Sequence, residues 1–248
     1  MSAENRILIQ GGIVIDGNNS PGYQANVLIE DDRIAVIGKL DSIDDAVQID
    51  AKGKVIAPGF IDPHNHANSE VEGGILKYPL ADNLIRQGIT TVICNQCGGD
   101  TFPIGTFLDA FDKVGAVTNV AMLASHGQAR RQAMKQTGIF KPCPEVWEAM
   151  RNLLRDEKVM PLERMIFRMT ARVADQFGIK GRGRISPGAF ADVVIFDPET
   201  VVDKSTWQNG YIYPQGIEWV IVNGRITVAN EKFLKNGFGR AIRRGAEM

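Results

Sequence analysis

The sequence predicts an α/β protein in which a strand–helix segment is inserted between two β-rich ends. Three observations predict it. Residues 6–57 hold short runs of β-branched residues separated by turns, residues 58–177 alternate strand-like with helical patterns, and strand-like runs return after Gly178. Alternation of strands with helices implies parallel pairing. We therefore expect three parts, residues 1–57, 58–177 and 178–248, with the first and last forming one β layer.

The N-terminal part is predicted to form strands and tight turns. Its apolar runs are short and rich in isoleucine and valine, which favour strands. The predicted strands are residues 7–9, 12–15, 25–29, 33–37 and 47–49, with turns at residues 16–19, 30–32 and 52–53. These turns are rich in Asp, Asn and Gly, which suit tight reversals of the chain.

The middle part is predicted to alternate strands and helices. A buried strand spans residues 55–61 around a Pro-Gly break, and two more follow at residues 90–94 and 119–124. The predicted helices lie at residues 80–87, 107–113, 144–155 and 161–177. Three of them end close to Gly88, Gly115 or Gly178, and the last begins at Pro161, which are common helix boundaries. The apolar stripes of the last two helices predict core packing rather than a cofactor site.

The C-terminal part is predicted to return to β structure. Residues 191–196 and 219–222 are strand-like, and Asn223-Gly224 is the strongest hairpin signal in the chain. Residues 240–244 hold three arginines close to the end of the chain. We interpret this stretch as a solvated tail.

Composition excludes several classes of protein. The net charge is −1 and the basic residues are scattered, which argues against a nucleic-acid partner. No run approaches eighteen apolar residues, so no membrane span is expected. Three cysteines, an odd number, argue against a disulfide framework and favour the reducing cytoplasm.

His64 and His66 form the most informative motif. They follow the buried strand and Asp62, two residues apart. In an extended segment alternate side chains share a face, so both imidazoles are expected to point the same way. Two nitrogen donors on one face make half of a transition-metal site. The competing interpretation is a surface coincidence, the usual origin of a lone His-x-His.

Beyond these patterns, the sequence resembles the D-aminoacylases, the N-acyl-D-amino-acid deacylases of the amidohydrolase superfamily. The motifs that carry the resemblance are residues 55–67, 85–92, 95–98, 119–130, 161–165, 169–170, 177–178, 183–188, 191–192, 196–198, 213–214 and 222–224. The resemblance implies a zinc-bearing (β/α)8 barrel packed on a small β-sandwich built from both termini. It also implies hydrolysis of the non-peptide C–N amide bond of a small N-acyl amino acid by a zinc-activated water.

Carried over residue by residue, the resemblance assigns metal-binding roles to His64, His66 and Cys97. It gives no catalytic or substrate-binding residue. His126 matches a histidine of the family that is not a ligand. The neighbouring Cys94 completes a Cys-x-x-Cys motif, and with Cys97 and the two histidines it could close a structural Cys2His2 zinc site.

The chain departs from the family by a large internal gap. Residues 58–177 number 120, whereas an eight-unit barrel takes about 250. The resemblance jumps within residues 155–160, so the barrel is expected to be incomplete, with its first three strand–helix units and its last helix. Two later zinc histidines and the family's acid–base aspartate have no counterpart. Asp62 and Asp100 are the nearest carboxylates in the sequence, and no sequence pattern assigns the acid–base role to either.

Two consequences follow from the gap. The chain could be a catalytically inactive shortened homologue, with a structural zinc site or a need for self-assembly. In addition, three parallel strands cannot close, so one edge of the sheet needs a cover. The candidates are the two amphipathic helices, the sandwich, disorder or a second copy in a homo-oligomer.

Overall fold

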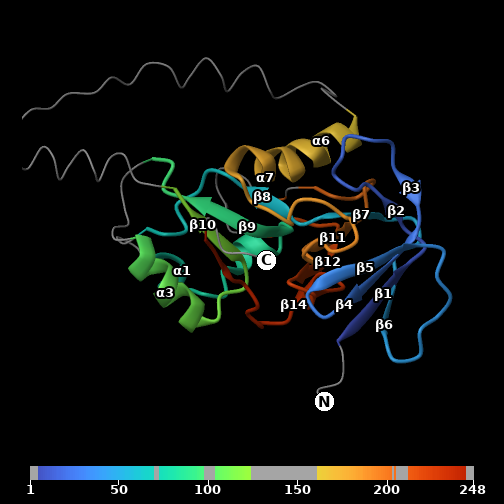
Figure 1. Cartoon of the computed structure of the whole chain (residues 1–248), viewed down its shortest axis with the longest axis horizontal. Helices are drawn as coiled ribbons and strands as arrows, with labels where there is room; N and C mark the ends of the chain where they lie inside the picture. Colours follow the sequence, from blue (N-terminus) through green and yellow to red (C-terminus); the bar gives the residue numbers. More distant parts are fainter. Residues whose placement is uncertain are drawn as a thin grey trace, which may run out of the picture.

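The computed structural model describes residues 5–69, 73–97, 104–123, 161–202, 204 and 212–243. In these residues the fold is α/β, with three sheets and helices that flank one of them (Figure 1). The predicted helix at 144–155, together with His126 and Asp100, lies outside the described residues. Among the described helices, none has the length and apolarity needed to cross a bilayer.

The first sheet comes from the N-terminal part of the chain. Its strand order is β5-β4-β1-β6. The strands are β1 (Arg6–Gln10), β4 (Asn26–Glu30), β5 (Arg33–Gly38) and β6 (Val47–Asp50). β1 pairs antiparallel with β4 and parallel with β6. The middle residues of β1 and β4 are buried, while their ends are partly exposed, as the short apolar runs predict.

The second sheet joins both ends of the chain, in the order β14-β13-β12-β11-β7-β2-β3. Its strands are β2 (Ile13–Val14), β3 (Tyr23–Gln24), β7 (Val55–Pro58), β11 (Val193–Phe196), β12 (Ile217–Val222), β13 (Arg225–Ala229) and β14 (Lys232–Phe233). β7 pairs with β11, so distant segments meet. Asn223 and Gly224 have φ of 49° and 73°, as the predicted hairpin turn requires.

The third sheet is parallel, in the order β15-β10-β9-β8. Its strands are β8 (Phe60–Asp62), β9 (Ile89–Cys94), β10 (Asn119–Met122) and β15 (Ala241–Ile242). The single strand predicted at residues 55–61 is therefore two strands in two sheets. Gly59 separates them, and its N–H donates to the Asp192 carbonyl at 2.8 Å. A Cβ at Gly59 would overlap Thr90, so only glycine permits this crossing.

Helices cover both faces of the parallel sheet. They are α1 (Gly74–Lys77), α2 (Asp82–Ile85), α3 (Ile104–Val114), α6 (Leu162–Met169) and α7 (Ala171–Phe177). Phe111 of α3 packs with Val92 and Val120 on one face. Ala174 of α7 packs with Ile61 and Ile93 on the other. Alternate residues of each strand thus reach two apolar layers, which explains the continuous apolar runs.

The predicted helix at residues 161–177 is interrupted. Thr170 separates α6 from α7 with φ −132° and ψ −93°, and its hydroxyl donates to the Ile166 carbonyl at 2.6 Å. A Cβ at Gly183 would come within 2.9 Å of the Thr170 backbone, so this loop packs directly on the break. The apolar stripe is continuous across Thr170, which is why the pattern alone predicts one helix.

The solvated tail predicted for residues 240–244 is wrong for the part that the structure describes. Residues 241–242 form β15, which pairs with β10 and covers its edge. Arg243 donates to Asp109 at 2.9 Å and to Asp112 at 2.7 Å, both on α3. Ile242 packs against the α7 side of the sheet. The three arginines in this short stretch suggest a solvated tail. In the structure Arg243 pairs with acidic residues that are distant in the sequence, and residues 241–242 form a strand.

A buried polar cluster lies where the parallel sheet meets the second sheet. Asp192 accepts hydrogen bonds from the Arg182 guanidinium, from the Asn223 N–H at 2.9 Å and from the Asn119 amide at 3.3 Å. The Asn223 amide donates in turn to Asn119 Oδ1 at 2.8 Å. All four residues are at most 5% exposed. These side chains satisfy one another, so we assign the cluster to structure.

Candidate metal centre

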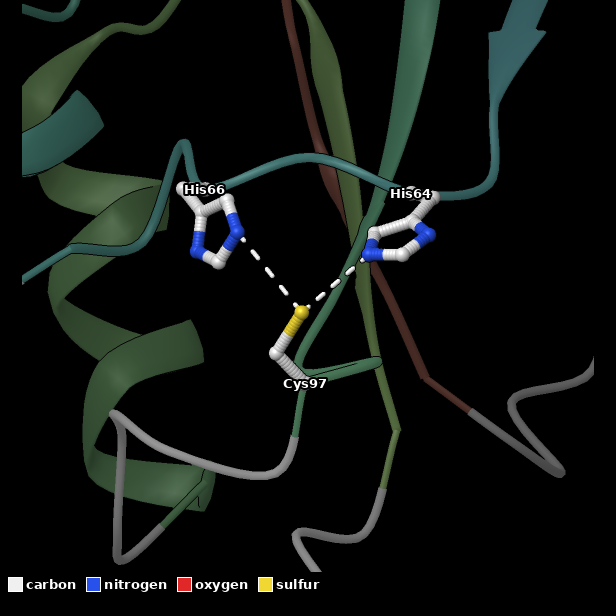
Figure 2. A group of neighbouring side chains, drawn as sticks. All are labelled: His64, His66 and Cys97. Carbon is white, nitrogen blue, oxygen red and sulfur yellow. Dashed lines mark hydrogen bonds between the residues drawn. The ribbon is translucent and has the colours of Figure 1, made fainter. Parts of the chain in front are cut away.

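His64, His66 and Cys97 meet at the carboxyl end of the parallel sheet (Figure 2). The two histidines lie in the loop after β8, and Cys97 lies in the loop after β9. Cys97 Sγ is 3.1 Å from His64 Nε2 and 3.7 Å from His66 Nε2. All three residues are exposed. The structure therefore brings together the three residues that the resemblance indicates.

The histidines share a direction for a reason other than the one predicted. β8 ends at Asp62, so neither histidine is in a strand. Asp62 instead turns the chain by accepting the His64 N–H at 3.0 Å, and Asn65 accepts the Ala67 N–H at 3.1 Å. Such Asx turns fix a loop locally. Both rings therefore face Cys97 from a structured loop, not from the alternation of an extended chain (Figure 2).

Cys94 is not part of this group. It is the last residue of β9, is fully buried, and its thiol donates to Asn65 Oδ1 at 3.2 Å. Burial raises the pKa of the Cys94 thiol to about 12. The Cys94 thiol also lies outside the group of donor atoms that His64, His66 and Cys97 form. The structure therefore gives no support to the Cys2His2 arrangement.

The donor set fits a transition-metal ion such as zinc. The ligand atoms of the three residues lie within 4.8 Å of one another. In tetrahedral zinc sites, sulfur at about 2.3 Å and nitrogen at about 2.0 Å put ligand atoms roughly 3.6 Å apart. The two sulfur–nitrogen distances bracket that value. Three protein donors leave a fourth position open, as catalytic zinc sites require.

A proton-handling carboxylate is missing from the group among the residues that the structure describes. Asp62 is next to the histidines in sequence, but its Oδ1 is engaged with the His64 N–H. In this part of the chain the site has ligands for an ion but no evident acid or base. An amide leaving group needs a proton from such a residue.

Sequence reasoning missed two asparagines that support the group. Asn95 is 6% exposed, has φ 76°, and donates to the Leu123 carbonyl at 3.1 Å. Asn68 is 3% exposed and donates to Asn95 Oδ1 at 2.7 Å. Asparagine is among the residues that tolerate positive φ, so its position just after a strand was a usable signal at Asn95. No comparable signal marks Asn68.

Part of the chain is similar in sequence to known amidohydrolases. The amidohydrolase family model matches residues 118–228. A D-aminoacylase of Alcaligenes xylosoxydans xylosoxydans is 31% identical over 151 residues, which are 52% of this chain and 30% of that protein. The N-acyl-D-glutamate deacylase of the same organism is 38% identical over 111 residues, 43% of this chain and 22% of that one. The matches thus span less than a third of these curated relatives.

Solved structures agree on the fold. A crystal structure of D-aminoacylase aligns with a TM-score of 0.77 at 19% identity, over 96% of this chain and 99% of that chain. An N-acyl-D-glutamate deacylase from Bordetella bronchiseptica, complexed with zinc and a phosphonate inhibitor, aligns with a TM-score of 0.75 at 20% identity over the same shares. The chain is thus similar to amidohydrolases. Among them, it resembles D-aminoacylases and N-acyl-D-amino-acid deacylases, as its motifs predict.

Proposed function

We propose that this chain is a metal-dependent amidohydrolase of the N-acyl-D-amino-acid deacylase type, which binds zinc through His64, His66 and Cys97. The observation that carries the proposal is the convergence of these three donors from two separate loops. Each donor follows a strand of one parallel sheet, so a single ion would link the ends of β8 and β9.

The residues of the site have distinct roles in this proposal. His64 and His66 supply imidazole nitrogens, and Cys97 supplies a thiolate, the ligand types that zinc prefers. When bound, zinc would supply the Lewis acidity that polarises an amide carbonyl. Because all three donors are exposed, a small N-acyl amino acid can approach them from solvent.

We further propose that the parallel sheet is an incomplete (β/α)8 barrel inserted in the sandwich. The barrel part would be residues 58–177, between sandwich parts at 1–57 and 178–248. β8, β9 and β10 would be its first three strands, α6 and α7 its last helix. Alignment across 96% of this chain and 99% of a solved D-aminoacylase supports an internal shortening, because both ends of the two chains correspond. α7 packs on Ile61 and Ile93, on the sheet face opposite α3.

The first test measures zinc and turnover on one protein sample. We expect about one zinc per chain, and slow release of the free amino acid from N-acetyl-D-methionine or N-acetyl-D-glutamate when zinc is present. The control is the double variant His64→Ala, His66→Ala, which should lose both. Turnover equal in the variant and the native chain would refute metal-dependent hydrolysis by this site.

A second candidate is a non-catalytic homologue that retains only metal binding. The observation that favours it is the absence of a carboxylate from the group in the described residues. Stoichiometric zinc without turnover would establish this candidate in place of hydrolysis. Cys94→Ser then tests a closed structural site. We expect unchanged zinc content because the Cys94 thiol is buried away from the group, and loss of zinc would assign it as a ligand.

Self-assembly is a third possibility, which we disfavour. The structure covers the β10 edge with β15, so a second copy is not needed there. Light scattering after size exclusion should give the mass of one chain. A stable dimer whose zinc content depends on dimerisation would instead support assembly.

A further inference from the structure

The three donors converge although neither of their loops is a regular element. Residues 63–69 and 95–97 contain no helix or strand, and the donor side chains themselves are exposed. Exposed loops of this kind hold a fixed geometry only when buried contacts beneath them define it. Contacts beneath the two loops must therefore hold Cys97 opposite the histidines.

Two buried amides beneath the donors make such contacts, beside the hydrogen bond from the Gln96 side chain to the Pro63 carbonyl. Asn95 stands two residues before Cys97, and Asn68 stands two residues after His66. The Asn68 amide donates to Asn95 Oδ1 at 2.7 Å, so one buried hydrogen bond ties the two donor loops together. Because both side chains are at least nine-tenths buried, water cannot replace this bond without a penalty.

Asn95 also anchors the loops to the sheet. Its amide donates to the Leu123 carbonyl at 3.1 Å, directly after β10, and the Leu123 N–H donates to the Cys94 carbonyl at 3.0 Å. Its φ of 76° reverses the chain as β9 ends and thus directs Cys97 back toward the β8 loop. Asn95 therefore joins the segments that follow three neighbouring strands.

The loop that carries His66 is closed in a similar way. The Ser69 N–H donates to the His66 carbonyl at 2.9 Å, and Ile75 at the start of α1 donates to the Ala67 carbonyl at 2.6 Å. Asn68 is thus held in a tight turn that is hydrogen-bonded to the start of α1. A shift of Asn68 would move His66, and a shift of Asn95 would move Cys97.

We propose that Asn95 and Asn68 are positioning residues of the metal centre. Their side-chain hydrogen bond holds Cys97 within reach of His64 and His66 before any ion binds. The affinity part of this inference rests on the proposed zinc function, whereas the geometric part concerns the metal-free protein. Residues that orient ligands in this way typically change metal affinity by about 10- to 100-fold when they are removed.

Asn95→Gly and Asn68→Ala test the proposal, because each removes one partner of the hydrogen bond between the two amides. Glycine accepts positive φ, so Asn95→Gly removes the amide but keeps the reversal of the chain. Asn68→Ala leaves the bond from Asn95 to Leu123 in place. We expect each variant to bind zinc or cobalt about 10- to 100-fold more weakly. We also expect a weaker thiolate-to-cobalt absorption band. The double variant should lose little more than Asn95→Gly alone, because both single variants remove the same bond between the two amides.

Asn26→Ala is the matched control. Asn26 begins β4 of the first sheet, where it accepts the Gly11 N–H at 3.0 Å and donates to the Leu40 carbonyl at 2.8 Å. Its removal eliminates the same kinds of hydrogen bond and lowers stability, but should leave the affinity for zinc unchanged. Equal losses of affinity in the control and in both site variants would overturn the proposal, since they would reflect general destabilisation.

A metal-free measurement separates this inference from the proposed function. In the metal-free native chain, we expect nuclear Overhauser contacts between the His64 ring and the Cys97 methylene, weakened in Asn95→Gly. If the native chain binds no zinc, the metal proposal fails while these contacts still test the positioning. Native contacts and native affinity retained in both Asn95→Gly and Asn68→Ala would refute the positioning role. If Asn95→Gly does not fold, Asn68→Ala alone decides.

Discussion

Polar side chains gather at both ends of the parallel sheet, but they are buried at the amino end and exposed at the carboxyl end. At the amino end, Asn119 meets Asp192, Arg182 and Asn223 in a buried cluster whose donors and acceptors face one another. At the carboxyl end, His64, His66 and Cys97 meet in an exposed group. The first cluster is complete without a ligand. The second group consists of nitrogen and sulfur donors that an ion from solvent can reach. Exposure and the type of ligand atom therefore distinguish the candidate site from the buried cluster, whereas polarity does not.

The largest expected effect is a loss of stability when the buried polar cluster around Asp192 is disrupted. Arg182→Met should destabilise the protein by about 3–5 kcal/mol because it leaves the Asp192 carboxylate buried without its partner charge. Urea unfolding followed by circular dichroism measures the change. Arg184→Met is the control, since Arg184 pairs with the exposed Asp175 at 2.7 Å, and exposed pairs contribute only about 0–1 kcal/mol. Equal destabilisation in both variants would contradict the assignment of the cluster.

The next effect concerns the covered edge of the sheet. Deletion of residues 241–248 removes β15 but keeps the hydrogen bonds of Phe238 and Arg240 to the buried cluster. It should cost about 2–4 kcal/mol, from the lost burial of Ile242 and its strand pairing. The β10 edge would be exposed, so self-association should increase with concentration. Unfolding and sedimentation measure both effects. Deletion of residues 244–248 alone keeps β15 and should behave like the intact chain. A truncated protein that is stable and monomeric would show that β15 is dispensable.

The third prediction concerns the different rates at which Cys94 and Cys97 should be alkylated. Burial raises the pKa of Cys94 to about 12, so its thiol stays protonated at pH 8 and should resist iodoacetamide, which reacts with thiolates. The exposed Cys97 should be modified. Peptide mass spectrometry after alkylation, with and without urea, identifies the sites. Modification of Cys94 in the folded protein at a rate similar to that of Cys97 would contradict its burial.

The smallest expected effect is on the stability of the metal-free protein. His64→Ala should change it by less than about 0.5 kcal/mol because the side chain is exposed. With zinc at 100 times its dissociation constant, the native chain should gain about 2.7 kcal/mol and the variant should gain much less. Thermal unfolding with and without zinc shows the difference. A large loss without zinc would mean that His64 is structural.

Local chemistry made much of the fold predictable. Asn223-Gly224 forms its hairpin because both residues adopt positive φ at low cost, and Gly178 ends α7 for the same reason. The apolar runs gave most strands within a few residues. His64, His66 and Cys97 were predicted from motifs, and the structure brings them together.

Other features depended on contacts between distant residues. Gly59 divides one apolar run between two sheets because Thr90 occupies the place of a Cβ. Residues 241–242 become a strand because β10 offers an unpaired edge and α3 offers acidic partners. Asn68 and Asn95 bond across two loops. The sequence by itself determined the local turns, the strand-forming runs and the ligand types, since these follow from the preferences of neighbouring residues. Only the tertiary structure decided which edges pair and which loops converge, because that depends on groups far apart in the chain.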